Sequence, residues 1–402
     1  MHPLKQRCCQ SASGRHNGQV NTHVTHVGPS TGVNLAALRG HNAALVLDLL
    51  RTAGEPGISR LELAERTGLT PQAVSKITAR LRADGLVVEA GRRASTGGKP
   101  RTVLRLVAGA GHAVGLHLDR DELRTVLTDL AGDVVAARRA PMDLGAGADA
   151  VLTTAACEID QLLAEGEAAG GDSVLGVGVA VPGPLDHAGG VLHRVTGFPQ
   201  WDGFPLRDAL AERLGLPVVV DKDTNAAALG LALVGAAGEG GRSFAYLHLG
   251  TGLGAGLVLD GALYRGERTG AGEFGHQVIQ LDGPPCECGN RGCIEAICLA
   301  AVAAGDVEEA ARVLGEGAGN LVGLLDIDAV LLGGRTVSAA EDLFVRGVGA
   351  VVETRARRGG GGRSIPVRSA PGGPTLVVEG AAQLILAPLF GRGTGKIPSR
   401  RP

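Results

Sequence analysis

The chain has 402 residues, and 44% of them are hydrophobic, which is enough for two or three domains with buried cores. Aromatic residues make up only 2%, so stacking surfaces for single-stranded nucleic acid are not expected. The formal net charge is -2, but residues 34–107 contain twelve Lys and Arg against six Asp and Glu, so the other residues are net acidic. A basic segment joined to an acidic one is typical of a protein in which one part contacts phosphates.

The first segment, residues 1–33, is polar and lacks the apolar core of a secretory signal. No later apolar run has the length of a membrane-spanning helix. We therefore predict a cytoplasmic protein with no membrane partner. Residues 1–33 and the end of the chain, residues 391–402, are expected to be disordered.

The basic segment begins with two predicted helices. The first, over residues 34–51, has apolar side chains along one face, which would pack inward: Leu35, Leu38, Leu45 and Leu49. A short helix follows over residues 59–68, in which Ser59 and Glu62 have the spacing of a capping box and Gly68 ends the helix.

A third helix is predicted over residues 70–85, with Thr70 as its N-cap and Pro71 in the first turn. Its inward face consists of Val74, Ile77 and Leu81. Its outward face is polar and basic and consists of Gln72, Ser75, Lys76 and Arg80. Two short helices joined by a tight turn, the second with such a face, indicate a helix-turn-helix whose recognition helix enters the major groove of DNA.

Residues 86–107 add two apolar strands around a basic, glycine-rich tip, which is the pattern of a wing. Side chains near the start of a recognition helix reach base edges, so we predict base contacts from Gln72, Ser75 and Lys76. Contacts to phosphates or to a minor groove are expected from Arg80, Arg92, Arg93, Lys99 and Arg101. The alternative is a small helical interaction domain whose basic residues are merely solvated. Caps, turn, charge and wing together favour a winged helix-turn-helix domain at residues 34–107.

From about residue 110, apolar runs punctuated by glycine alternate with alanine-rich helical segments. The strand-like runs are residues 113–119, 174–185, 217–223, 244–261 and 329–334. This alternation indicates an α/β body, which we place at residues 110–390.

Three of the seven cysteines, Cys286, Cys288 and Cys293, lie within eight positions, and His276 precedes the first by ten. Three thiolates and one imidazole are the number and kind of ligands that close a tetrahedral zinc shell, with no position left for a metal-bound water. The alternative is a set of disulfides. Because thiols stay reduced in the cytosol and the cysteine count is odd, we predict a structural Zn²⁺ site.

The body resembles the ROK family, in which sugar kinases and transcriptional repressors share an actin-like ATPase fold. The resemblance is carried by VPGPLD at 181–186, DKDTNAAAL at 221–229, LGTGLGAGLV at 249–258, GAGEFGH at 270–276 and CECGNRGCIE at 286–295. It extends over residues 34 to about 390 and implies an α/β body of two subdomains behind the winged domain. The cluster of cysteines and histidine matches the family's zinc pattern in ligand type and spacing.

The resemblance also allows a comparison with the family's kinases, whose first phosphate loop reads Asp-x-Gly-Gly-Thr. The matching stretch here runs from His117 to Asp121 and lacks both glycines. Bulky side chains would block the backbone's approach to phosphates, and Asp119 and Asp121 would repel a triphosphate. ATP binding is therefore expected to be lost or severely weakened, and we predict no enzyme activity. The second glycine loop, residues 250–256, is present, and it serves equally well as a tight turn between strands.

The sugar side of the family's site is better preserved. By resemblance, Asp223 holds the position of the kinases' general base, and Glu273, His276 and Glu295 match residues that bind sugar hydroxyls. Gly183 would let the backbone approach the sugar. With one ring nitrogen of His276 on zinc and the other toward the sugar, the metal would hold both glutamates toward one pocket.

Three features depart from the family's pattern. Lys222 stands where an asparagine usually precedes the aspartate, and it either pairs with Asp223 or selects an anionic sugar such as a sugar phosphate. An asparagine expected within residues 196–203 is missing. The stretch from Glu295 to residue 334 is shorter than usual, which would affect the C-terminal subdomain and dimerisation.

Three classes of function are compatible with parts of the sequence. A sugar-responsive DNA-binding regulator, most simply a repressor of genes for carbohydrate uptake or catabolism, explains the winged domain, the lost phosphate loop and the retained carboxylates. An active, glucokinase-like sugar kinase explains only the carboxylates, and a structural zinc-bound interaction protein explains only the cysteines. We therefore predict the regulator, acting as a homodimer or homotetramer on double-stranded operator DNA, with a sugar or sugar phosphate as effector.

Overall fold

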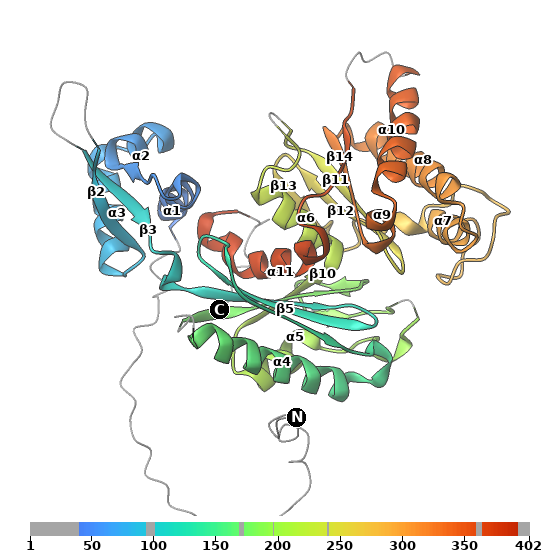
Figure 1. The fold of residues 1–402 in the computed structure, drawn as a ribbon, viewed down its shortest axis with the longest axis horizontal. Coiled ribbons are helices and arrows are strands. Elements are labelled where there is room, and N and C mark those ends of the chain that lie inside the picture. Colours follow the sequence, from blue (N-terminus) through green and yellow to red (C-terminus); the bar gives the residue numbers. More distant parts are fainter. Residues whose placement is uncertain are drawn as a thin grey trace, which may run out of the picture.

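The computed structural model describes residues 40–93, 101–168, 173–195, 197–238, 241–358 and 364–392. A small winged domain is followed by a body of two lobes, each built on its own sheet (Figure 1). The predicted leader and residues 393–402 of the predicted tail lie outside the described residues.

The winged domain combines three helices with a small sheet. The helices are α1 (His41–Ala53), α2 (Arg60–Thr67) and α3 (Pro71–Ala83). The strands are β1 (Ile58–Ser59), β2 (Val87–Arg93) and β3 (Arg101–Leu106), in the order β1-β3-β2. The antiparallel pairing of β2 with β3 confirms the two strands of the predicted wing, whose tip at residues 94–100 lies outside the described residues.

Local signals in the sequence set the ends of these helices. The Ser59 side chain accepts from the Glu62 N–H, and the Glu62 carboxylate accepts in return from the Ser59 N–H, so the predicted capping box is confirmed. Gly68 ends α2 with a φ of 70°, a left-handed conformation that glycine adopts readily. Thr70 caps α3, as predicted, by accepting from the Ala73 N–H. The first helix is described from His41 only, and residues 34–39 are outside the described part of the chain.

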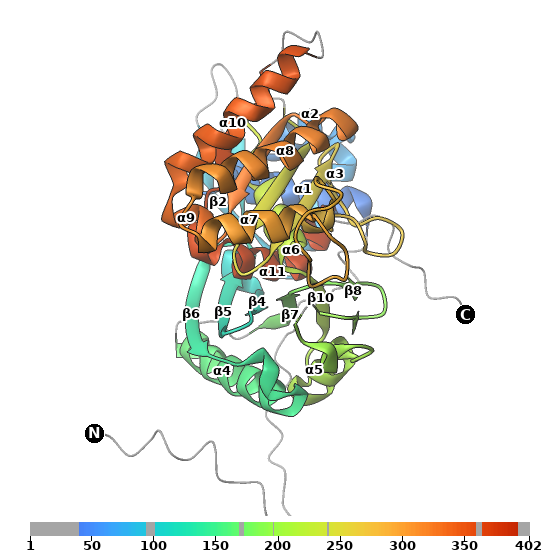
Figure 2. The same cartoon turned by 90° about the vertical axis from the view of Figure 1, so that its right-hand side faces the viewer.

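Lobe I carries a five-stranded sheet in the order β10-β7-β4-β5-β6. Its strands are β4 (His112–Leu118), β5 (Glu122–Asp129), β6 (Val134–Pro141), β7 (Val174–Val181) and β10 (Val218–Lys222). β4, β5 and β6 form an antiparallel meander, and β7 and β10 join β4 in parallel. Helices α4 (Ala148–Ala168) and α5 (Leu206–Leu214) cover one face (Figure 2).

Lobe II repeats this arrangement. Its sheet has the order β13-β12-β11-β14-β15, with an antiparallel meander followed by two parallel strands. The strands are β11 (Phe244–Leu249), β12 (Leu253–Leu259), β13 (Ala262–Tyr264), β14 (Ala329–Gly333) and β15 (Val367–Ser369). The helices of this lobe are α7 (Ile294–Ala303), α8 (Val307–Leu325), α9 (Arg335–Ala339) and α10 (Glu341–Arg358).

Two helices lie between the sheets of the lobes (Figure 2): α6 (Asp223–Leu233) and α11 (Leu376–Leu386). They cross with almost no side chain between them, since a Cβ on Gly380 would lie 2.1 Å from the carbonyl oxygen of Ala226. The segment Gly373–Phe390 is apolar and long enough to cross a membrane, but 56% of it is buried inside the protein. Its apolar character is accounted for by packing against β4, β7 and α6.

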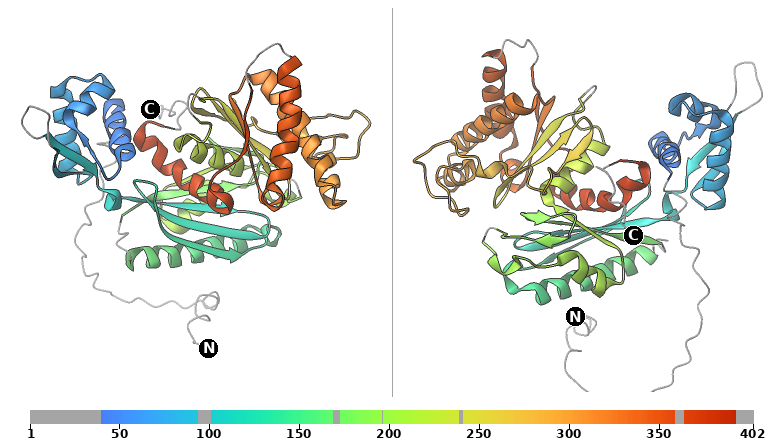
Figure 3. Two further views of the ribbon diagram at one scale, coloured as in Figure 1. Left: turned by 45° about the horizontal axis from the view of Figure 1, so that its top comes forward. Right: turned by 180° about the vertical axis from the view of Figure 1, so that it is seen from behind.

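The winged domain stands to one side of the body and contacts it through α1 (Figure 3). One apolar cluster is shared by α1, lobe I and the C-terminal end of α11, and it includes Leu50, Val378 and Phe390. Arg392 donates to Asp48 Oδ2 at 2.7 Å, and the guanidinium of Arg51 lies 5.0 Å from the centroid of the Phe390 ring. The winged domain is therefore attached to the body by packing and by ion pairing.

The structure confirms every strand-like run that the sequence indicated, and in the body it adds strands that the pattern did not reveal. These are β5, β6, β13, β15 and the two-residue strands β8 (Leu185–Asp186) and β9 (Val191–Leu192), which pair with each other. β6 lies at the edge of its sheet, and its apolar stretch, residues 134–137, is only four residues long and is followed by two arginines. β13 and β15 contain three residues each, too few for a recognisable pattern.

Candidate functional site

A cleft between the lobes contains all six residues predicted to bind a sugar: Gly183, Lys222, Asp223, Glu273, His276 and Glu295. Gly183 follows β7, and Lys222 and Asp223 lie where β10 joins α6. Glu273 precedes the 3-10 turn Phe274–His276, which ends with His276, and Glu295 lies in the first turn of α7. The cavity encloses about 110 Å³, which suits one small polar molecule. The cleft thus brings together Gly183 and Glu295, which are 112 positions apart in the sequence.

A buried carboxylate fixes the junction between β10 and α6. Asp221 is fully buried, and its Oδ1 accepts from the Lys222 N–H and from Asn225 Nδ2, both at 2.8 Å. Its Oδ2 accepts from Arg265 Nε at 2.7 Å. Because its acceptors and its charge are matched, Asp221 holds the next two residues, Lys222 and Asp223, in a fixed position at the cleft.

Glu295 is held by the predicted glycine loop. The Leu253 N–H donates to Glu295 Oε2 at 2.7 Å, and a Cβ on Gly252 or Gly275 would lie 3.2 Å from this oxygen. The loop is the turn between β11 and β12, closed by a hydrogen bond from Gly250 N to Gly252 O. It therefore serves as a tight turn and also lines the cleft.

Lys222 does not pair with Asp223, which was one of the two alternatives from the sequence. Its Nζ lies 3.0 Å from Glu273 Oε1 and 2.5 Å from the carbonyl oxygen of Ala271. Asp223 instead accepts from the Thr224 N–H at 2.6 Å. One of the predicted sugar-binding carboxylates is thus the partner of an ammonium group.

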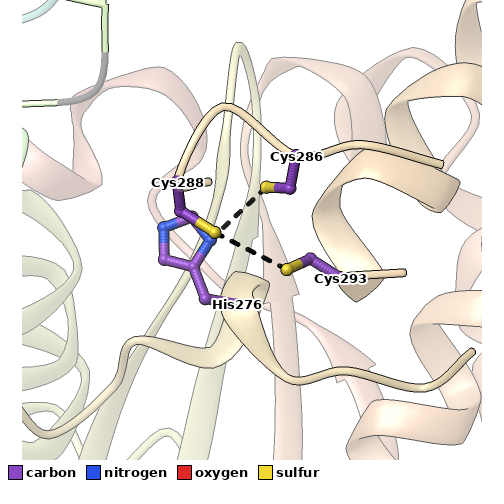
Figure 4. Close-up of side chains that lie close together, drawn as sticks. All are labelled: His276, Cys286, Cys288 and Cys293. Carbon is purple, nitrogen blue, oxygen red and sulfur yellow. Dashed lines mark hydrogen bonds between the residues drawn. The ribbon is translucent and has the colours of Figure 1, made fainter. Parts of the chain in front are cut away.

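The four predicted metal ligands converge beside the cleft, where His276 lies opposite the three cysteines (Figure 4). Their ligand atoms all lie within 4.8 Å of one another. The sulfurs of Cys288 and Cys293 are 3.7 Å apart, and Cys286 Sγ is 3.8 Å from His276 Nδ1. Disulfides require sulfurs about 2.05 Å apart, whereas two sulfurs on one tetrahedral zinc are separated by about 3.8 Å.

The donor set and the distances therefore fit a metal ion with three thiolates and one imidazole. Burial is the main reason that the pKa of the Cys293 thiol is raised, to about 12. A metal ion that binds this sulfur therefore has to displace the thiol proton. Because Nδ1 of His276 faces the cysteines, Nε2 is left as the nitrogen for the cleft, which His276 also lines.

Arg335 spans the two lobes at the stretch that matches the first phosphate loop of the kinases. It donates from Nη2 to Asp119 Oδ2 at 2.6 Å, and from Nη1 and Nη2 to the two oxygens of Asp121 at 3.1 and 3.0 Å. The hydrogen bonds with Asp121 are the main reason that the pKa of Arg335 is raised, and the same hydrogen bonds are the main reason that the pKa of Asp121 is lowered. Burial opposes the shift at Asp119, but His117, the Arg120 N–H and Arg335 together lower its pKa.

This arrangement changes one part of the expectation. Asp119 and Asp121 are not bare charges, because Arg335 neutralises them in part. These contacts reduce the repulsion that the two carboxylates were expected to exert on a triphosphate. Burial lowers the pKa of His117, so its imidazole is neutral at pH 7.

The predicted DNA contacts of α3 are on its exposed face. Gln72, Ser75, Lys76 and Arg80 are all exposed, while Val74, Thr78 and Leu81 are buried and Ile77 packs partly buried against the same core. On the wing, Arg92 and Arg101 are exposed. The side chain of Arg93 and all of Lys99 lie outside the described residues.

Three residues of the cleft were missed by sequence reasoning: Arg120, His248 and Arg335. Arg120 stacks on Phe198 with its guanidinium 5.4 Å from the ring centroid, and His248 Nδ1 lies 2.9 Å from the Tyr246 hydroxyl. Arg120 lies in the stretch that was compared with the first phosphate loop but was given no role there, and no motif marks His248 or Arg335. Arg335 in particular is an ordinary polar residue after a strand until the lobes are brought together.

Two family models match the chain. The ROK family matches residues 113–301, and a winged helix-turn-helix DNA-binding model matches residues 46–88. Among curated relatives, the xylose repressor of Caldicellulosiruptor bescii is 32% identical over 238 residues, which are 59% of this chain and 59% of the repressor. The match thus spans less than two thirds of that relative's length.

Solved structures agree with the two-part architecture. A ROK family transcriptional regulator, described as a homologue of the Escherichia coli MLC protein, has a TM-score of 0.71 at 23% identity and covers 87% of this chain and 96% of its own. A ROK family glucokinase from Streptomyces griseus, in complex with glucose and AMPPNP, has a TM-score of 0.55 at 27% identity and covers 68% of this chain and 99% of its own. The chain thus carries a ROK family domain, matched over residues 113–301, behind a winged helix-turn-helix domain.

Proposed function

We propose that the protein is a cytoplasmic, sugar-responsive transcriptional regulator that represses genes for carbohydrate uptake or catabolism. The observation that carries the proposal is the union, in one chain, of an exposed recognition helix, in a domain that packs through α1 against the segment after α11, and a cleft lined by carboxylates at the start of α6. The similarity to a xylose repressor supports this proposal and makes D-xylose the first sugar to test.

On the DNA side, α3 enters the major groove, and its first turns read base edges through Gln72, Ser75 and Lys76. The basic residues at the end of α3 and on the wing contact phosphates or a minor groove: Arg80, Arg92, Arg93, Lys99 and Arg101. A homodimer or homotetramer presents two such domains to half-sites separated by whole turns of DNA, so the operator has approximate two-fold symmetry.

In the cleft, Asp223 and Glu295 accept hydrogen bonds from sugar hydroxyls, since carboxylates are strong acceptors. His276 contributes Nε2, and Gly183 allows close approach of the backbone. Lys222 and Glu273 complete the wall as a pair. A Zn²⁺ ion held by His276, Cys286, Cys288 and Cys293 fixes the segment between the two glutamates and so preserves the shape of the pocket.

The signal passes through helices that touch at backbone distance. α6 begins at Asp223 and crosses α11 at Gly230, where a Cβ would lie 3.3 Å from the Cα of Gly380. α11 is followed by the 3-10 helix Ala387–Phe390 and by Arg392, and Phe390 and Arg392 contact α1 of the winged domain. A sugar releases DNA if it binds more tightly to a body conformation that moves these helices and misplaces α3.

A second candidate function is ATP-dependent sugar phosphorylation, which the position of Asp223 and the turn at Gly250–Gly254 favour. We propose that this activity is absent, because the stretch from His117 to Asp121 lacks the two glycines that would let its backbone approach the phosphates of a nucleotide. A coupled assay with hexoses and pentoses tests this point. Turnover that disappears in Asp223→Asn would establish a kinase, and turnover unaffected by that change would indicate a contaminant.

The regulator itself is tested by electrophoretic mobility shift on DNA fragments recovered by genomic footprinting. We expect a specific complex that dissociates when the effector sugar is added. Failure to bind any recovered duplex would contradict the proposal and leave a zinc-bound interaction protein as the remaining class.

A further inference from the structure

Lys222 has an unusual environment for a lysine, since only 4% of its side chain is exposed. Its ammonium group donates to the Ala271 carbonyl and to Glu273 Oε1. An ammonium has three N–H donors. Two are thus used within the protein, and the third is available to a ligand in the cleft, which Lys222 lines.

The lysine reaches this position because residue 183 is a glycine. A Cβ at position 183 would lie 2.7 Å from Lys222 Cδ and 3.1 Å from its Cγ. Gly183 therefore receives the methylene stem of Lys222 in addition to bordering the cleft. Packing fixes the methylene stem of Lys222, and two acceptors fix its ammonium group. The third N–H therefore has a defined position at the cleft.

The negative charge of Glu273 balances the positive charge of Lys222. Because the Glu273 side chain is 40% exposed, solvent partly screens the interaction between the two charges. Among the other carboxylates of the pocket, Asp119 is paired with Arg335, whereas Asp223 and Glu295 accept from backbone N–H groups and have no salt bridge within the described residues. Arg120 is the cation left to offset them, and it stacks on Phe198. The balance of these charges is negative, which disfavours an anionic ligand.

We propose that Lys222 and Glu273 form a neutral pair that makes the pocket specific for an uncharged monosaccharide and excludes sugar phosphates and sugar acids. Lys222 donates its third N–H to an oxygen of the sugar, while Asp223 and Glu295 accept from its hydroxyls. This inference rests on the proposed function of the cleft as the effector site, and it decides between the two effector classes that the sequence left open.

The test compares neutral and anionic sugars on the full-length, zinc-loaded protein by isothermal titration calorimetry. The ligands are D-xylose and D-glucose, with D-glucose 6-phosphate and D-glucuronate as anionic counterparts of glucose. We expect a neutral sugar to bind at least about tenfold more tightly than an anionic one, the effect of roughly one uncompensated charge at close range. Tighter binding of either anion than of both neutral sugars overturns the proposal.

Isosteric variants separate the charge of the pair from its packing. Lys222→Met leaves Glu273 unpaired, so the preference for neutral over anionic sugar rises, while the affinity for the neutral sugar falls with the lost donor. Glu273→Gln leaves Lys222 unpaired, so the preference falls by about tenfold. In the double variant the pair of side chains is neutral again, so the preference for neutral over anionic sugar returns toward the wild-type value. The affinity for the neutral sugar stays as weak as in Lys222→Met. Arg346→Ala, exposed on α10, is the matched control and changes neither quantity.

The outcomes distinguish this inference from the proposed function. If neutral sugars bind and release DNA but the preference is the same in all three pocket variants, the role of Lys222 is wrong and the regulator remains. If the wild type binds operator DNA but neither neutral nor anionic sugars, the effector part of the proposed function fails and this inference fails with it. Folding of each variant is checked by its zinc content and unfolding midpoint.

Discussion

The bridge that Arg335 makes between the lobes should stabilise the body measurably. Its guanidinium contacts two carboxylates, bidentate on Asp121 and by a single bond on Asp119, with side-chain exposures of 47%, 64% and 21%. An exposed ion pair contributes about 0.2–1 kcal/mol, and the more buried pair with Asp119 belongs at the upper end or slightly above it. Replacing Arg335 with Ala should therefore lower the free energy of unfolding by about 1–2 kcal/mol at pH 7.

The pH dependence of this difference follows from the lowered pKa values of both aspartates. A carboxylate whose pKa is depressed on folding stabilises the protein above its unfolded pKa, about 3.9, and the stabilisation is lost as pH falls through the folded pKa. The gap between wild type and Arg335→Ala should thus be full at pH 7 and shrink below about pH 4. Urea unfolding at several pH values measures it, with Arg346→Ala as the control. A gap that is absent at pH 7, or equally large at pH 3, would refute the reasoning.

Three further results are expected. Metal analysis of reduced protein should find about one zinc per chain, lost together with body stability in Cys288→Ser; no zinc in the wild type, or full retention in the variant, would contradict the metal site. Lys76→Ala should weaken specific operator binding without changing sugar affinity measured by calorimetry. Glu295→Gln, which alters a carboxylate proposed to accept from the sugar, should bind operator as the wild type does but resist release by sugar in a mobility shift, and release at the wild-type concentration would show that the effector pocket lies elsewhere.

Features with a local cause could be predicted from the sequence. The capping box at Ser59 and the Thr70 cap need only neighbouring residues, and the structure has both. The candidate metal ligands Cys286, Cys288 and Cys293 lie within one turn-rich segment, so their spacing in the sequence was enough to bring them together. Apolar strands such as β7 and β10 were visible because burial on both faces requires continuous apolar runs.

Features that depend on the meeting of distant segments could not be predicted. Arg335 is 214 positions from Asp121, and nothing near it in sequence marks it as the partner of a carboxylate. Lys222 was a comparable case, because the neighbouring Asp223 is the obvious candidate partner while the actual one, Glu273, is 51 residues away. An ion pair is decided by which side chains the folded backbone brings within reach, and local spacing does not contain that information.

The same limitation applies to how the protein couples its two ends, which only the arrangement of helices makes plain. α11 contacts α6, the sheet of lobe I and, through Phe390 and Arg392, the helix α1. Gly230 and Gly380 allow α6 and α11 to touch at backbone distance, so a shift of one helix cannot be absorbed by side-chain rearrangement. A pocket ligand that moves the start of α6 at Asp223 would therefore act on a rigid pair of helices, and the segment that follows α11 contacts the winged domain through Arg392 and Asp48. Coupling between sugar and DNA then requires only that the sugar prefer one position of this pair.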